Sequence, residues 1–221
     1  MTRKIKVGNV YIGGGAPISV QSMCNTKTAD VENTIKQIIS LKNAGGDIVR
    51  FAVNSASDAA AIKEIKNATD IPLVADIQYD YKLAVLSAEN GIDKVRINPG
   101  NIGDERKVRY LADVLKERNI PIRIGVNTGS LEKDLKNLNP ADALVESAKR
   151  HIKILENAGF FDIIVSLKSS DVRTSVAAAR KFSKEFDYPL HLGVTEAGTF
   201  ERGTCATTSF TGPALPPAIS I

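Results

Sequence analysis

Cysteine is scarce in this sequence, whose 221 residues contain only Cys24 and Cys205. Two cysteines exclude a framework of several disulfides and a metal site built from cysteine alone. No apolar run reaches the ~18 residues that a transmembrane helix needs. The N-terminal segment also lacks the apolar core of a signal peptide. We therefore expect a cytoplasmic protein without a membrane segment.

The sequence also lacks a large excess of charge of either sign. Lys and Arg total 29 against 25 Asp and Glu, which gives a net charge of +4. This excess is too small to indicate a nucleic-acid partner, although it suits an anionic ligand. The hydrophobic fraction of 43% and the charged fraction of 24% are ordinary for a soluble globular domain. We expect one domain with a core large enough to be stable.

Strands and helices are predicted to alternate after an N-terminal hairpin. Polar and apolar residues alternate over residues 4–12 around the turn pair Gly8-Asn9, which predicts a β-hairpin. Seven short, mostly apolar runs then predict strands, at residues 18–23, 47–53, 72–77, 94–98, 120–127, 162–168 and 189–196. Six amphipathic stretches lie between them and predict helices, at residues 30–44, 57–67, 81–90, 104–118, 141–158 and 172–186.

Such an alternation indicates parallel strands joined by helical crossovers. A closed barrel and an open doubly wound sheet both fit it. The hairpin favours the barrel because it can plug the N-terminal mouth. The segment after the first strand, residues 23–26, also lacks the Gly-rich fingerprint of a doubly wound nucleotide-binding fold. The predicted fold class is therefore α/β, a TIM-type (β/α)8 barrel preceded by a hairpin and incomplete, with about seven strands.

The C-terminal segment does not continue the pattern. Residues 199–221 show no helical period and contain three prolines, which a buried central strand does not tolerate. We predict a barrel domain over residues 1–198 and an irregular tail over residues 199–221. Either the tail folds over the open edge of the sheet, or the chain is a truncated form of a longer protein.

Polar side chains interrupt the predicted strands, mostly in their C-terminal halves. In a barrel these positions meet at the mouth that carries active sites. Four of them are cationic and two are acidic: Arg50, Arg96, Arg123 and Lys168 against Asp76 and Glu196. One interpretation is that these groups only pair with one another. The surplus of about two positive charges favours a second interpretation, a phosphate or diphosphate ester held by the arginines.

Single residues in this set leave alternatives open. Glu196 is a candidate proton donor or a partner of Lys168. Asp76 is a candidate for orienting substrate hydroxyls or for holding Arg50 or Arg96. The glycine-containing loops at residues 98–103 and 125–131 favour anions. We expect His191 to be a satisfied structural histidine and Cys24 to be inert.

Long motifs give these residues a family context. They lie at residues 17–23, 47–50, 74–77, 94–103, 123–131, 166–170 and 191–198. On these motifs the chain resembles the 4-hydroxy-3-methylbut-2-en-1-yl diphosphate synthases of the non-mevalonate isoprenoid pathway, from about Lys4 to Thr199. The resemblance implies an iron-sulfur oxidoreductase that converts 2-C-methyl-D-erythritol 2,4-cyclodiphosphate by ring opening and reductive dehydroxylation.

The resemblance also implies roles for residues and partners. Glu196 would serve in proton transfer and Asp76 would position the substrate. The diphosphate would be held by Arg50, Arg96, Asn98, Arg123, Asn127 and Lys168. Electrons would come from flavodoxin or ferredoxin through a 4Fe-4S cluster in a separate C-terminal domain, and the full-length family works as a homodimer.

Two departures limit what the resemblance implies. Gln78 stands where the family commonly has histidine. The eighth strand and the cluster domain are missing, so we expect no metal ligands here and no turnover by this chain alone. Two other hypotheses are a pterin-diphosphate-using barrel enzyme similar to dihydropteroate synthase and a non-catalytic anion-binding module. Binding of a pterin diphosphate in preference to the cyclodiphosphate would favour the dihydropteroate-synthase-like enzyme. The absence of ligand-induced stabilisation would indicate the non-catalytic module.

Overall fold

A curled parallel sheet forms the centre of the protein. The computed structural model describes residues 1–102, 104–193 and 219–220. All seven predicted strands are present and all pair in parallel. They are β3 (Gln21–Met23), β4 (Ile48–Ala52), β5 (Leu73–Asp76), β6 (Lys94–Ile97), β7 (Ile122–Asn127), β8 (Ile163–Lys168) and β9 (Leu190–His191). Neighbours along the chain are neighbours in the sheet, which is the strand order of a barrel.

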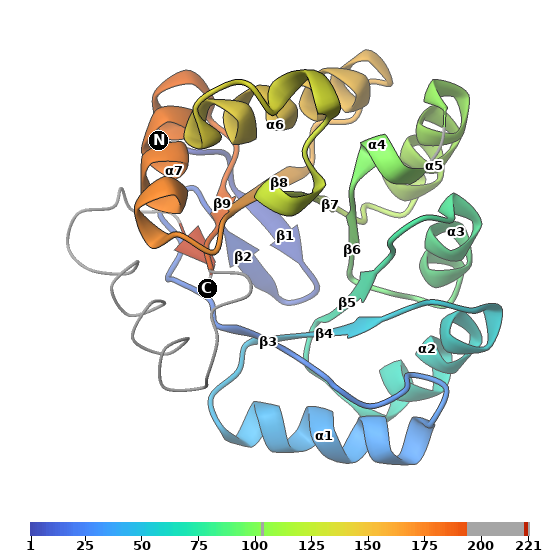
Figure 1. The fold of residues 1–221 in the computed structure, drawn as a ribbon. Coiled ribbons are helices and arrows are strands. Elements are labelled where there is room, and N and C mark those ends of the chain that lie inside the picture. Colours follow the sequence, from blue (N-terminus) through green and yellow to red (C-terminus); the bar gives the residue numbers. More distant parts are fainter. Residues whose placement is uncertain (103, 194–218, 221) are drawn as a thin grey trace.

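The predicted helices lie on the outside of this sheet, as Figure 1 shows. They are α1 (Val31–Asn43), α2 (Ala56–Ala68), α3 (Tyr81–Glu89), α5 (Glu105–Glu117), α6 (Pro140–Asn157) and α7 (Val172–Glu185). Their buried apolar residues and the outward-facing residues of the strands form one continuous core. The α/β barrel-type architecture predicted from the sequence is therefore confirmed. No helix among the described residues combines the length and apolar character that a membrane crossing requires.

Local sequence signals fix where the helices begin and end. The side chains of Asp30, Ser55 and Asp171 accept hydrogen bonds from backbone N–H groups in the first turns of α1, α2 and α7. Gly45 and Gly159 follow the ends of α1 and α6 with φ values of 95° and 70°, a conformation that glycine adopts without strain.

The N-terminal hairpin closes one end of the sheet. Its strands β1 (Ile5–Val7) and β2 (Val10–Ile12) pair in antiparallel register, as predicted. Figure 1 shows the hairpin near the centre of the ring of strands. Its apolar side chains pack against the inward-facing residues at the beginnings of three strands, and together they form a second core cluster: Ile5, Val7, Ile12, Ile48, Val74 and Ile164. The hairpin is therefore the plug that the sequence predicts.

Four short elements were not predicted. The helix α4 (Pro99–Ile102) follows β6, and the 3-10 helices η1 (Thr128–Ser130) and η2 (Lys133–Leu135) follow β7. The strand β10 (Ile219–Ser220) pairs in parallel with β9. It lies beyond the last proline, Pro217, so its backbone N–H groups are available for pairing. The predicted tail otherwise lies outside the described residues, and its irregular structure and the boundary at residue 198 stay predictions.

Candidate anion-binding site

The strands direct five basic side chains into the interior of the curled sheet. Side chains alternate between the two faces of a strand, so the inward residues of β6 are Lys94 and Arg96, and those of β7 include Arg123. Arg96 is in register with Asp76 of β5 on one side and with Arg123 on the other. The remaining two basic residues are Arg50 on β4 and Lys168 at the end of β8. We call these five residues and Asp76 the interior cluster.

Asp76 is the centre of the ion pairs in the interior cluster. Its Oδ1 atom accepts a hydrogen bond from Arg96 Nη1 at 2.9 Å, and its Oδ2 atom lies 3.6 Å from Arg50 Nη1. The carboxylate is 8% exposed. The sequence analysis left open whether Asp76 holds Arg50 or Arg96, and the structure shows that it contacts both. Its role toward a substrate stays a prediction.

Arg123 has no such partner. Its side chain is buried, and its Nε and Nη1 atoms lack hydrogen-bond partners in the structure. Burial, together with the neighbouring Arg50 and Arg96, lowers the pKa of the guanidinium well below its ordinary value. A buried charge without a partner costs several kcal/mol. The guanidinium therefore offers an unused fork that matches phosphate oxygens.

A glycine makes room for Arg96. A Cβ atom at Gly125 would lie 2.6 Å from Arg96 Nε and 2.8 Å from Arg96 Nη2. Gly125 occupies the middle of β7, in register with Ser166. The sequence analysis assigned this glycine to an anion-binding loop, whereas the structure shows that it accommodates the guanidinium that binds Asp76.

Lys168 and Lys94 complete the cluster. Burial, followed by the charges of Arg123, Arg50 and Arg96, lowers the pKa of Lys168 to about 7. Lys94 is fully buried, and its Nζ atom donates a hydrogen bond to Gln21 Oε1 at 3.0 Å. Sequence reasoning missed Lys94. The signal was present, since a residue two positions before an inward-facing Arg96 must also face inward.

The charge balance of this interior favours an anion. Among the residues that the structure describes, one carboxylate, that of Asp76, faces five basic side chains. The sequence analysis expected four cations against two carboxylates. The second of these, Glu196, lies outside the described residues. A negatively charged ligand such as a diphosphate would reduce this surplus of positive charge.

The other predicted site residues lie near the ends of the same strands. Asn98 follows β6 and is buried, and Asn127 ends β7 in register with Lys168. The backbone carbonyl of Asn127 accepts a hydrogen bond from Ser130 Oγ. Gln78, which replaces the family's usual histidine, is exposed between β5 and α3. Asn98 and Asn127 are thus placed where they could contact a ligand of the interior cluster.

Two residues that the sequence analysis set aside lie within the core. His191 is buried, and desolvation, followed by the charges of the nearby cations, lowers its pKa well below the ordinary value of 6.5, which favours the neutral imidazole. Its Nδ1 atom has no hydrogen-bond partner, so the expectation of a satisfied histidine was wrong. Burial raises the pKa of the Cys24 thiol to about 11, which makes it unreactive, as predicted.

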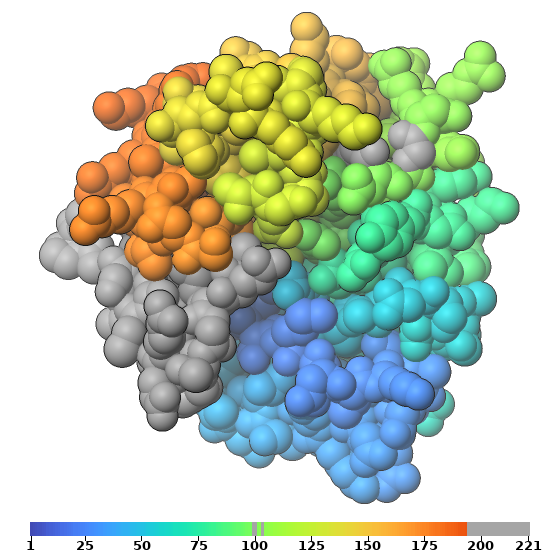
Figure 2. Space-filling model, in the orientation of Figure 1, coloured from blue at the N-terminus to red at the C-terminus, as the bar shows by residue number. Residues whose placement is uncertain are grey.

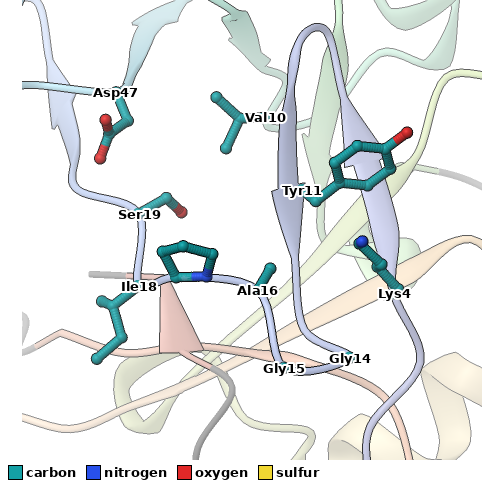
Figure 3. A pocket seen from close by; sticks show the side chains of 10 residues that line it. Lys4, Val10, Tyr11, Gly14, Gly15, Ala16, Ile18, Ser19 and Asp47 are labelled. Atoms are coloured by element: carbon teal, nitrogen blue, oxygen red, sulfur yellow. The ribbon is translucent and has the colours of Figure 1, made fainter.

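A separate hollow lies beside the hairpin. It has a volume of about 350 Å³ and is lined by Lys4, Val10, Tyr11, Gly14, Gly15, Ala16, Pro17, Ile18, Ser19 and Asp47. Figure 3 shows Tyr11 and Lys4 on the hairpin, with Ser19 and Asp47 across from them. The Lys4 ammonium lies 4.4 Å from the centre of the Tyr11 ring. This hollow contains no member of the interior cluster. Figure 2, in the orientation of Figure 1, shows a depression near the middle of the molecule, between the blue N-terminal residues and the green residues from the middle of the chain.

Comparison with curated proteins finds close relatives. The chain is 58% identical over 206 residues to the 4-hydroxy-3-methylbut-2-en-1-yl diphosphate synthase (flavodoxin) of Fusobacterium nucleatum, covering 92% of this chain and 58% of that protein. It is 53% identical over 217 residues to the protein of the same name from Lysinibacillus sphaericus, covering 97% of this chain and 58% of that protein. The chain thus spans less than two thirds of the length of these relatives.

The fold is shared more widely than the sequence. The dihydropteroate synthase of Xanthomonas albilineans in complex with 7,8-dihydropteroate superposes with a TM-score of 0.67 at 10% identity, covering 94% of this chain and 86% of that one. This likeness shows the barrel architecture alone. The sequence profile of the GcpE TIM-barrel domain, by contrast, matches residues 2–218, so the chain belongs to the GcpE family through its TIM-barrel domain.

Proposed function

We propose that this chain is the substrate-binding barrel of an enzyme that converts 2-C-methyl-D-erythritol 2,4-cyclodiphosphate to 4-hydroxy-3-methylbut-2-enyl diphosphate. The observation that carries the proposal is the unpartnered Arg123 guanidinium within a cluster of five basic residues and one described carboxylate. The names of relatives with 53–58% identity supply the reaction. The cyclodiphosphate supplies the negative charge that the cluster lacks.

The residues of this chain would bind and orient the substrate. Arg123 would donate to phosphoryl oxygens through its unused nitrogens, and the ammonium form of Lys168 would add a further donor. Asp76 would hold Arg50 and Arg96 in place while they contact the second phosphoryl group. Asn98 and Asn127 would donate from the ends of β6 and β7. Glu196 would donate a proton to the leaving hydroxyl group.

The electrons would come from outside the barrel. The relatives are named for flavodoxin, so flavodoxin, or ferredoxin in its place, is the proposed donor, and the cytoplasm is the proposed compartment. The 4Fe-4S cluster of the family does not fit the described residues, because they contain no group of three or more His, Cys, Asp or Glu side chains placed to hold a metal. Cys24 is also buried with a raised pKa. The proposal therefore assigns binding to this chain, with a homodimer as the state of full-length members.

Isothermal titration calorimetry with the cyclodiphosphate tests this proposal. We expect one ligand per chain. The variant Arg123→Gln should bind about 10–100-fold more weakly, since a hydrogen bond to a charged group contributes about 1.5–3 kcal/mol. The control Arg150→Gln removes an exposed arginine of α6 that pairs with Asp134, and it should bind like the parent chain.

Two results would reject the proposal, provided that circular dichroism shows folded protein. One is the absence of binding heat, and the other is equal affinity in Arg123→Gln and the parent chain. Tighter binding of a pterin diphosphate than of the cyclodiphosphate would instead support the alternative similar to dihydropteroate synthase.

A further inference from the structure

Lys168, like Arg123, is a member of the interior cluster without a polar partner among the described residues. Its amine makes no hydrogen bond and no ion pair in the described structure, whereas Arg50 and Arg96 contact Asp76 and Lys94 donates to Gln21. Lys168 ends β8, and its Nζ atom lies against the backbone of Gly193, where an added Cβ would be 3.1 Å away. The amine is therefore free to react.

The surroundings of Lys168 are almost entirely basic. The titratable groups that act on it from across the sheet are Arg123 of β7, Arg50 of β4, Arg96 of β6 and Asp76 of β5, and Lys168 in turn acts on His191 of β9. The single carboxylate in this set is already shared by two arginines. Like charges and desolvation therefore disfavour the ammonium form, and the pKa of Lys168 falls to about 7. Near neutral pH, about half of the molecules carry an amine with a free electron pair.

The amine is also within reach of a ligand. Lys168 is partly exposed, whereas Lys94 is fully buried beneath the cluster. Arg123 lies on β7, next to β8, and Arg96 lies one strand further on β6, so the two arginines would hold a phosphate group on the same side of the interior as Lys168. A phosphate anchor next to a neutral amine is an arrangement that favours a covalent reaction with a phosphorylated carbonyl compound.

We infer that Lys168 is a covalent attachment site for small phosphorylated aldehydes, which the arginines of the interior cluster hold by the phosphate. The inference rests on the anion-binding part of the proposed function. It goes beyond that function because no covalent bond to the chain takes part in the proposed reaction.

The reaction is the formation of an imine. The Lys168 nitrogen attacks the carbonyl carbon, and the carbonyl oxygen becomes a hydroxyl group of the carbinolamine. The proton of this hydroxyl group replaces one that the nitrogen gives up. In the second step the nitrogen loses its other proton, and the hydroxyl group takes up one proton and leaves as water. Two N–H bonds and the C=O bond are thereby replaced by the C=N bond and the two O–H bonds of water. No oxidant or reductant is needed. Borohydride, added as a reagent, transfers a hydride to the imine carbon while water protonates the nitrogen, and the product is a stable secondary amine.

Labelling with pyridoxal 5′-phosphate followed by borohydride tests the inference on the full chain. Peptide mass spectrometry would locate the label. At pH 7 we expect Lys168 to be labelled at least about 100-fold faster than Lys36, because the exposed ion pair with Glu32 raises the pKa of Lys36. The rate at Lys168 should rise with pH to a plateau above about pH 8. Inorganic pyrophosphate should protect Lys168 and leave Lys36 unaffected.

Matched variants and probes complete the experiment. Lys168→Arg keeps the positive charge and should abolish the label at this position, whereas Lys181→Arg, on an exposed lysine of α7, should change nothing. Pyridoxal without its phosphate should label Lys168 at least about 10-fold more slowly, since it lacks the charged anchor. Labelling confined to surface lysines, or labelling of Lys168 without protection by pyrophosphate, would overturn the inference.

The two proposals fail separately. If the cyclodiphosphate does not bind but pyridoxal 5′-phosphate still labels Lys168 with pyrophosphate protection, the proposed substrate is wrong and the attachment site stands. If the cyclodiphosphate binds with the expected loss in Arg123→Gln but Lys168 is not labelled, the attachment site is wrong and the proposed function stands.

Discussion

The glycine at position 125 determines where Arg96 lies in the anion-binding site. The Arg96 guanidinium lies where the side chain of residue 125 would be, and this position allows it to reach Asp76. Gly125 lies within a strand, where glycine is normally unfavourable, so its presence requires a reason of this kind. The ion pair of Arg96 and Asp76 and the glycine at position 125 therefore form one structural unit.

Replacing this glycine is expected to damage binding. In Gly125→Ala the new methyl group would force the Arg96 guanidinium away from Asp76, which should lower the free energy of unfolding by about 1–3 kcal/mol. Cyclodiphosphate affinity should fall about 10-fold or more. Urea denaturation and calorimetry measure the two effects.

The matched control is Gly129→Ala, since a Cβ at Gly129 meets no atom within 4 Å. It should change stability by less than about 0.5 kcal/mol. Equal behaviour of the two variants would show that Arg96 does not depend on the space at position 125.

The sequence predicted the members of the site better than their contacts. Charged residues stand out in strands that are otherwise apolar, so Arg50, Arg96 and Arg123 were identifiable without a structure. Lys94 was overlooked because it begins a strand, where lysine is also common at the surface. The contacts of these residues depend on distances that a sequence pattern does not contain. Asp76 binds two arginines, and two nitrogens of Arg123 have no hydrogen-bond partner.

At the scale of elements, the hairpin and the strands have separate tasks. The first inward-facing residues of β4, β5 and β8 are apolar and pack against the hairpin, whereas the next inward-facing residues, Arg50, Asp76 and Ser166, are polar. The plug thereby seals the end of the sheet opposite to the predicted site. Water is excluded from that end, which strengthens the electrostatic interactions of the interior cluster.

The plug should be required for stability. Ile12 is 1% exposed at the end of β2, and truncation of a buried isoleucine to alanine costs about 2–5 kcal/mol. We expect Ile12→Ala to lower the free energy of unfolding by this amount in urea denaturation followed by circular dichroism. Ile39→Ala serves as the control because Ile39, on α1, is 44% exposed, and it should cost less than about 0.5 kcal/mol. A comparable loss in the two variants would mean that the hairpin is not part of the cooperative core.

Most elements follow from local signals, and the exceptions have physical reasons. Apolar runs, capping residues and helix-ending glycines located the seven strands and six helices. The helix α4 was missed because its four residues form one turn, too short to show a helical period. The strand β10 was missed because pairing with β9 is a long-range contact, while the prolines before it argue locally against a strand.

At the scale of the whole molecule, the buried basic residues of the interior cluster lower the stability of the ligand-free protein and favour the binding of an anion. Desolvation of Lys168, Lys94 and Arg123 disfavours their charged forms and lowers the free energy of unfolding, which the same residues at the surface would not do. A ligand that binds only the folded state returns this free energy, by about 2.7 kcal/mol at a concentration 100 times its dissociation constant. A protein with such unpaired buried charges is expected to have a lower free energy of unfolding without its ligand than with it.

The pH dependence of stability follows from the same cluster. Lys168 has a pKa of about 7 in the folded chain and an ordinary value of 10.5 when unfolded. Between these values the unfolded chain binds more protons, so the contribution of Lys168 to the free energy of unfolding increases as the pH rises from about 7 to about 10.5. Below pH 7 its destabilising effect is fully present, and above pH 10.5 it is absent.

Replacing this lysine should therefore stabilise the protein without ligand at neutral pH. Lys168→Met removes the desolvated charge, and we expect the free energy of unfolding at pH 7 to rise by about 2–4 kcal/mol, since each tenfold change in proton affinity corresponds to about 1.4 kcal/mol and partial exposure screens some of it. Urea denaturation at pH 7, 8.5 and 10 should show the gain shrinking as the pH rises. Lys181→Met is the control, because Lys181 is exposed, pairs with Asp142 and has a raised pKa, so its loss should not stabilise the chain at any of these pH values. A gain in Lys168→Met that stays constant with pH would show that improved packing, rather than the charge, is responsible.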